Sequence, residues 1–198
     1  VDAYQVRTDS VVADAIVRRI ETVGEEDIRD YNYLFFFNKP YYVYDNESEE
    51  VCMEIEYLKN GKMVRQRIDS DAEETAKGLS RGDGILFSED MDGNIMFIKK
   101  VYDRKTGTYP TETTEWNSGR RNIGGIVDIK YSDHIKLEGS DEIFNMNTAE
   151  TTIAIYDSNE NKLTAGSVSD IIDKTTGLPS KLYMRVYYGI PRSVLIIR

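Results

Sequence analysis

The residue types best suited to catalysis are scarce in this chain. It holds one histidine, His134, and one cysteine, Cys52, among 198 residues. A hydrolase triad needs a base for the nucleophile's proton, usually histidine, and zinc sites combine several His and Cys ligands. Cys52 lies in the alternating run Val51–Tyr57, where a small buried core residue is expected. We therefore predict no catalytic residue, no metal site and no cofactor, and expect a chain that is not an enzyme.

Glycines and acidic residues could form a phosphate-binding or a calcium-binding loop, but their spacing here matches neither motif. Gly78, Gly82 and Gly84 do not form the G-x-G-x-x-G pattern that cradles phosphates. Residues 157–161 place side-chain oxygens at alternating positions, as a calcium loop does, but Lys162 stands where that loop needs glycine. The sequence favours an Asx-rich hairpin turn there.

Carboxylates are numerous enough for chance pairs to be inevitable, since the chain has 35 Asp and Glu residues. Two carboxylates can serve a glycosidase, so an acidic glycosidase-like enzyme stays open as the least favoured of three functions. The tripeptide Arg81-Gly-Asp83 spells the integrin motif. It stands at the start of a predicted strand, where turn chemistry explains its Gly and Asp.

Aromatic residues form the most distinctive local pattern. Tyr31 to Phe37 and Tyr41 to Tyr44 are two neighbouring aromatic runs, and the odd positions of the first are expected to share one face. Most of this pattern is explained if the aromatic side chains fill a barrel core and cover one side of the barrel. The alternative is an exposed strip that stacks on sugars or docks a partner, with these candidate residues: Tyr41, Tyr42, Tyr44 and Trp116.

Strand and turn signals dominate the rest of the chain. Asn60-Gly61 and Asp92-Gly93 separate alternating apolar runs, which is a strong hairpin signal because these turns need positive φ. Residues 71–79 form either a short helix or an irregular loop, and residues 168–173 form one helical turn. No long amphipathic pattern occurs. The predicted fold class is all-β, with two small barrel-like or sandwich-like modules and short helical turns.

The domain organisation follows from a change in composition. Residues 103–121 are rich in Lys, Thr, Gly, Asn and Ser and predict a linker or long surface loop. We expect a first β-rich module with an aromatic strand insertion at 1–102 and a second small barrel-like module at 122–198. Since the chain begins at Val1 and not at a methionine, we expect a segment of a longer protein; a processed N-terminus is the alternative.

Charge narrows the choice of partners. The net charge is −10, and an acidic surface opposes the counterion release on which phosphate-binding proteins depend. No apolar run approaches the length of a membrane span. We therefore predict neither nucleic acid as a partner nor membrane insertion of this segment.

Several short sequence segments resemble the non-anchoring, β-rich regions of S-layer-homology-domain proteins from clostridia-like bacteria. In the first module these are residues 15–23, 58–62, 79–87 and 92–95. In the second they are residues 126–128, 152–157, 162–170 and 181–189. The aromatic insertion at residues 35–50 departs from that pattern, and no S-layer-homology repeat is present.

The resemblance implies a location and a role. It implies an extracellular chain at the cell surface or cell wall, anchored through domains outside this chain, and a structural or spacer role. Cell-wall glycan and other surface proteins are the candidate partners. The alternative function from another class is a carbohydrate-binding module that uses the tyrosine strip.

Overall fold

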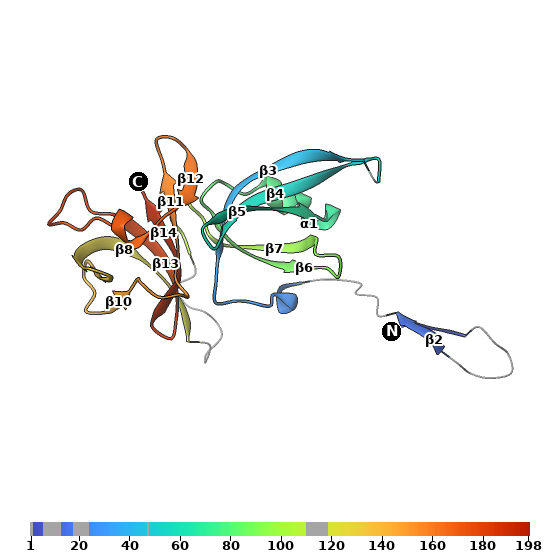
Figure 1. Cartoon of the computed structure of the whole chain (residues 1–198), viewed down its shortest axis with the longest axis horizontal. Helices are drawn as coiled ribbons and strands as arrows, with labels where there is room; N and C mark the ends of the chain where they lie inside the picture. Colours follow the sequence, from blue (N-terminus) through green and yellow to red (C-terminus); the bar gives the residue numbers. More distant parts are fainter. Residues whose placement is uncertain (1, 6–12, 18–23, 47, 110–118) are drawn as a thin grey trace.

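The structure is a computed structural model that describes residues 2–5, 13–17, 24–46, 48–109 and 119–198. The predicted all-β fold class is confirmed. Five strands close a barrel and seven form a second sheet, while a further two-stranded pair, β1 (Asp2–Gln5) and β2 (Ala13–Val17), precedes them (Figure 1). The barrel and the second sheet are called the first and second module below.

The first module is a closed barrel with strand order β3-β4-β5-β7-β6, and the 3-10 helix η1 (Glu25–Asp27) precedes it. Its strands are β3 (Phe35–Asp45), β4 (Glu50–Lys59), β5 (Lys62–Ile68), β6 (Gly84–Glu89) and β7 (Ile95–Tyr102). Asn60 and Gly61, with φ of 49° and 73°, form the β4–β5 turn, and Gly93, with φ of 83°, lies in the β6–β7 turn. Both predicted hairpins are therefore present. The predicted positive φ occurs at both residues of Asn60-Gly61 but only at the glycine of Asp92-Gly93.

A short helix closes one end of the barrel. Of the two alternatives for residues 71–79, the structure has the helix, α1 (Ser70–Lys77). The Asp69 side chain caps it by accepting a hydrogen bond from the Asp71 N–H at 3.1 Å. Ala72 and Ala76 are buried in the barrel core, because their small side chains let the helix approach the strands closely.

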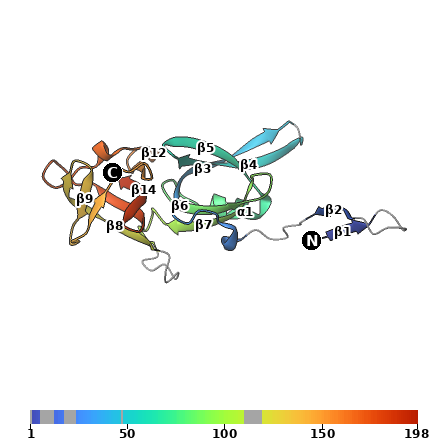
Figure 2. The ribbon, with the colours of Figure 1, turned by 60° about the horizontal axis from the view of Figure 1, so that its bottom comes forward.

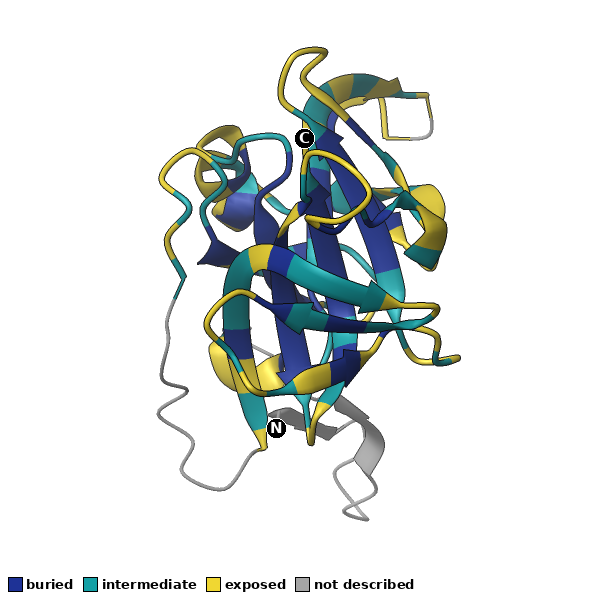
Figure 3. Cartoon of the chain, turned by 90° about the vertical axis from the view of Figure 1, so that its left-hand side faces the viewer, coloured by how far each residue is buried: buried dark blue, intermediate teal, exposed yellow. Residues whose placement is uncertain are grey.

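The second module is a seven-stranded sheet with order β10-β9-β8-β13-β14-β11-β12. Among the described strands of this sheet, only β11 and β14 pair in parallel. One face packs on its own core, which includes Val127, Phe144 and Met184, and Figure 3 shows this buried centre surrounded by exposed loops. Its elements are β8 (Arg120–Tyr131), β9 (His134–Leu137), β10 (Ile143–Asn145), β11 (Thr152–Asp157), β12 (Lys162–Ala165), the 3-10 helix η2 (Val168–Asp170), β13 (Lys181–Tyr187) and β14 (Ile190–Ile197).

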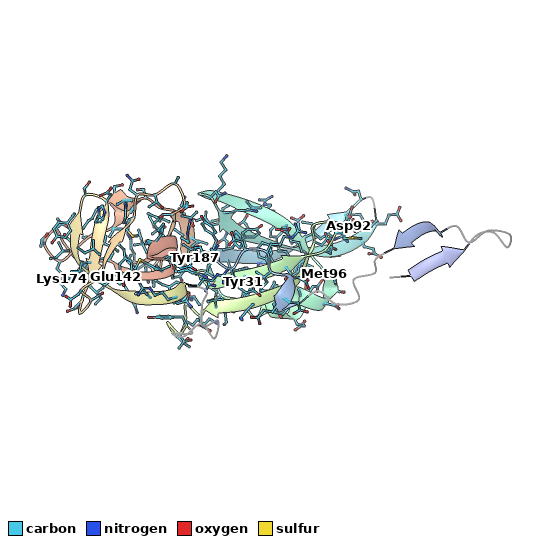
Figure 4. The ribbon with its side chains drawn as sticks, turned by 90° about the horizontal axis from the view of Figure 1, so that it is seen from below. Tyr31, Asp92, Met96, Glu142, Lys174 and Tyr187 are labelled. Atoms are coloured by element: carbon cyan, nitrogen blue, oxygen red, sulfur yellow. The ribbon has the colours of Figure 1, made fainter. Side chains whose placement is uncertain are left out.

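The two modules lie side by side and share a buried apolar cluster (Figures 1 and 2). Leu34, on the segment that leads into β3, donates its N–H to Ser193 Oγ of β14 at 2.8 Å. Arg120 of β8 lies 5.5 Å from the ring centroids of both Tyr31 and Tyr187, which meet near the boundary between the modules (Figure 4). The barrel residues in this cluster are Phe36, Leu58, Leu86, Val101 and Tyr102. The residues of the second sheet in it are Ala154, Tyr156, Leu163, Tyr183 and Leu195.

A β-bulge at Asn38 changes which aromatic residues share a face. The pairing of β3 with β4 shifts register between Phe37 and Lys39. Before the bulge, Phe37 faces the barrel core opposite Tyr57; after it, Tyr42 lies opposite the buried Met53. The inward face thus passes from odd to even positions, because a bulge adds one residue to one strand only. Period-two alternation alone does not place a bulge.

The segment predicted as a linker is only partly described. Residues 103–109 form a tight turn, in which the Asp103 N–H donates to the Thr108 carbonyl at 2.9 Å. Strand β8 begins at Arg120. Residues 110–118, including the candidate Trp116, lie outside the described residues. The predicted linker and the predicted role of Trp116 remain predictions.

Candidate functional site

The candidate tyrosines Tyr41, Tyr42 and Tyr44 lie in the second half of β3, from which the β3–β4 ribbon continues beyond the barrel (Figure 1). Tyr42 pairs with Met53, and Tyr44 pairs with Val51. Tyr42 is 56% exposed and Tyr44 is 60% exposed, so neither ring is part of a core. These two residues, called the tyrosine pair below, share one face because they lie two positions apart in a strand.

Tyr41 does not belong to the tyrosine pair. It lies on the opposite face, where its hydroxyl donates to Glu54 Oε2 at 2.7 Å. Lys39 Nζ and the Arg65 guanidinium lie 5.8 and 5.4 Å from its ring centroid. Burial and the bond to Glu54 raise the pKa of Tyr41 to about 12. The predicted strip of three tyrosines is therefore split between two faces, and two rings remain as a platform.

A second feature, which the sequence did not suggest, lies at the boundary of the modules. A cavity of about 380 Å³ opens beside Phe35, between the β4–β5 turn and the loop before β11. A smaller cavity of about 160 Å³ lies against the same ring toward the end of β6. Both are lined by Asp30, Phe35 and Lys59, so we treat them as one junction groove. No sequence motif marks it, because its walls come from distant segments.

The motifs considered for other chemistry are built into turns. His134 Nδ1 lies 2.7 Å from Asp133 Oδ1, and its side chain is 43% exposed. Asp157 Oδ1 accepts hydrogen bonds from the N–H groups of Asn159 and Glu160, which is the expected Asx turn. Within the residues that the structure describes, no cluster of three or more His, Cys, Asp or Glu side chains is arranged to hold a metal ion.

The Arg81-Gly-Asp83 tripeptide is part of the module boundary. Asp83 is fully buried and accepts hydrogen bonds from the N–H groups of Ser80 at 2.7 Å and Arg104 at 2.8 Å. Burial raises the pKa of its carboxyl, while these backbone donors act in the opposite direction. Gly82 lies against the Tyr156 ring of the second module. The three residues are therefore not presented as a free loop to a receptor.

Comparison with known proteins identifies no family. No family model matches the chain, and no curated protein matches it. One solved structure that aligns with it is the crystal structure of the p204 HINb domain, with 11% sequence identity, over 87% of this chain and 95% of that one. The TM-score is 0.26, which is too low to support an argument about fold family or function. No helix among the described residues has both the length and the apolar character needed to cross a membrane.

Proposed function

We propose that this chain is a non-catalytic structural and interaction segment of a bacterial cell-surface protein, in which two β modules act as one stiff unit. The observation that carries the proposal is the buried cluster shared by the modules. A spacer has to keep its length and direction under load. Interfaces between domains resist relative motion when they are large and apolar.

Polar contacts strengthen the same boundary. Ser193 Oγ accepts from the Leu34 N–H and donates to the Leu34 carbonyl oxygen at 3.2 Å, so this buried hydroxyl is satisfied on both sides. Arg104 of the first module lies 4.6 Å from the Tyr156 ring centroid of the second. Directional contacts of this kind favour one relative orientation of the modules. The cell-surface location in the proposal rests on the sequence resemblance.

Stiffness can be tested with a pair of spin labels. Met91, which is 78% exposed, and Leu178, which is 89% exposed, lie in different modules and can each be replaced by cysteine without touching either core. Pulsed dipolar spectroscopy of the doubly labelled protein should give one narrow distance distribution. A broad or two-peaked distribution would contradict a stiff unit. The single variants, each labelled alone, control for labelling of the native Cys52.

The location is tested separately on the gene. An export signal upstream and wall-anchoring repeats elsewhere in the encoded protein are expected. Antibody against this segment should then label intact cells. An encoded protein that has no export signal and is retained inside the cell would overturn the cell-surface part of the proposal and leave the stiffness result standing.

A second candidate function is carbohydrate binding by the tyrosine pair. The observation in its favour is the exposure of both rings on one face of a strand. Residues two apart in a strand are about 7 Å apart, a spacing at which one sugar chain can touch both rings. Retention on purified peptidoglycan should fall in Tyr42→Ala and Tyr44→Ala. Tyr131→Ala, which removes a 54% exposed tyrosine from β8, is the control. Equal retention of all variants would exclude this candidate.

A further inference from the structure

The junction groove has a fixed aromatic ring as its floor. Phe35 is half-buried, and its ring is held between two others: Tyr57 at 5.4 Å, edge-on, and Phe87 at 4.9 Å. Tyr57 and Phe87 also contact each other at 5.3 Å. The Phe35 ring therefore cannot turn away without disturbing the barrel core. Fixed aromatic faces of this kind bind ligands with little loss of conformational freedom.

The walls of the groove come from three separate segments of the chain. Residues 27–35 form one side, and Leu58, Lys59 and Asn60 at the β4–β5 turn form another. Ala149 and Thr152, from the second module, complete the larger half. The larger half is of the size of small-molecule sites, which range from about 300 to 1,000 Å³. It exists only because the two modules are docked.

Two charged side chains stand at the groove with bonding capacity to spare. Lys59 Nζ lies 5.7 Å from the Phe35 ring centroid, and within the described part of the chain it has no ion pair. Asp30 uses Oδ1 to accept the Asn32 N–H at 2.8 Å, and among the described contacts its other oxygen accepts no hydrogen bond. The groove thus offers donors and acceptors together around an aromatic face.

The balance of charge indicates which ligands fit. Lys59 and Asp30 oppose each other in sign where the two halves meet, and Arg29 is accompanied by Asp27 and Glu89 in the smaller half. The chain as a whole carries a net charge of −10, which disfavours polyanions. An apolar ligand would make no use of Lys59 and Asp30, which are exposed to water at the groove. An uncharged ligand with one flat C–H face and several hydroxyl or amide groups satisfies the ring and both charged groups at once.

We propose that the junction groove is a binding site for a neutral saccharide, with Phe35 as the stacking platform and Lys59 and Asp30 as hydrogen-bonding partners of its hydroxyl or acetamido groups. This site is distinct from the tyrosine pair, which lies in the second half of β3 and does not line the groove. It adds a ligand to the spacer role and requires neither the cell-surface location nor sugar binding by Tyr42 and Tyr44.

The test is calorimetric titration of the whole chain with two neutral probes, tetra-N-acetylchitotetraose and cellotetraose. Phe35→Leu keeps an apolar side chain but removes the flat ring, and it should weaken binding about tenfold. Lys59→Ala removes one charged donor and should also weaken binding about tenfold. Lys62→Ala is the matched control, because Lys62 is exposed at the other side of the same turn and does not line the groove. Tyr44→Ala controls for the tyrosine pair.

The outcomes are distinct. Saturable binding that Phe35→Leu and Lys59→Ala weaken, while Lys62→Ala and Tyr44→Ala leave it unchanged, supports the site. Binding that only Tyr44→Ala weakens overturns it in favour of the tyrosine pair. Equal effects of Lys59→Ala and Lys62→Ala, or no binding of either probe at millimolar concentration, overturn it as well. If Phe35→Leu fails to fold, the comparison of the two lysine variants decides alone.

Discussion

Tyr102 at the end of β7 and Tyr183 in β13 stack face to face across the module boundary, with ring centroids 4.0 Å apart and planes inclined by 15°. Tyr109 lies 5.2 Å from Tyr183 and completes a three-ring group. Burial raises the pKa of Tyr102 to about 12 and raises that of Tyr183 as well, so both phenols stay neutral. The contact joins the last strand of the barrel to a central strand of the sheet.

Removing this stack should uncouple the modules. Tyr183→Ala is expected to cost about 3–5 kcal/mol, as large aromatic-to-alanine changes in cores do. Calorimetry should then resolve two unfolding transitions in place of one. Tyr183→Phe keeps the ring and loses only the hydroxyl's 3.1 Å bond to Asn122, which is expected to cost about 1 kcal/mol. A Tyr183→Ala protein that still unfolds in one transition would show that the rest of the interface suffices.

Gly82 should tolerate alanine less well than Gly93, although both have a similar positive φ of 87° and 83°. A Cβ at Gly82 would lie 3.0 Å from the Tyr156 ring, whereas a Cβ at Gly93 would meet nothing within 4 Å. Gly93→Ala is therefore expected to cost about 1–2 kcal/mol from backbone strain alone. Urea denaturation of both variants isolates the extra cost at Gly82. Equal urea midpoints for the two variants would mean that the Tyr156 ring can move to make room for the new methyl group.

Asp173 should make stability depend on acidity. The residue is 4% exposed, and its carboxylate accepts hydrogen bonds from the Thr176 and Thr175 hydroxyls at 2.7 and 2.8 Å and from the Lys130 N–H at 3.0 Å. Bonds to Thr176, then Lys130 and Thr175, hold its pKa well below the usual value. Because the pKa is lower in the folded chain, the stabilisation is complete above the unfolded pKa of about 4 and is lost as pH falls below it.

The measurement is thermal unfolding between neutral pH and strongly acidic pH. The melting temperature of the unmodified chain should fall on acidification. Asp173→Asn should melt several degrees lower at neutral pH, and its melting temperature should depend less on pH. Asp141→Asn is the control, because Asp141 is fully exposed. If the melting temperature of Asp173→Asn falls with pH as steeply as that of the unmodified chain, other carboxylates cause the acid sensitivity.

Cys52 should be chemically silent in the folded protein. It is 9% exposed and lies in β4, opposite Val43 of β3. A thiol reagent should react with it only as fast as the barrel opens, and at once in denaturant, since buried structural thiols are inert. A Met91→Cys variant supplies the reference, because that position is 78% exposed. Rapid reaction of Cys52 in the unmodified chain would mean that the β3–β4 ribbon opens locally.

The sequence by itself determined the class of structure and its turns. Strand-favouring residues, the scarcity of helical periodicity and the dipeptides Asn60-Gly61 and Asp92-Gly93 were enough to predict an all-β chain with two hairpins in its first half. These features are local, because a turn depends on the φ values that its own residues allow. The exclusion of zinc sites that need several His or Cys ligands was likewise a matter of counting.

Only the tertiary structure decided which aromatic rings are exposed and where the groove lies. The bulge at Asn38 reversed the alternation, so that Tyr42 and Tyr44, and not Tyr41, continue the face that carries Phe37 before the bulge. The junction groove brings Phe35 and Lys59 together with Thr152, which lies far along the chain. Neither outcome follows from local preference, because strand register and the docking of modules are set by the burial of apolar surface between distant segments.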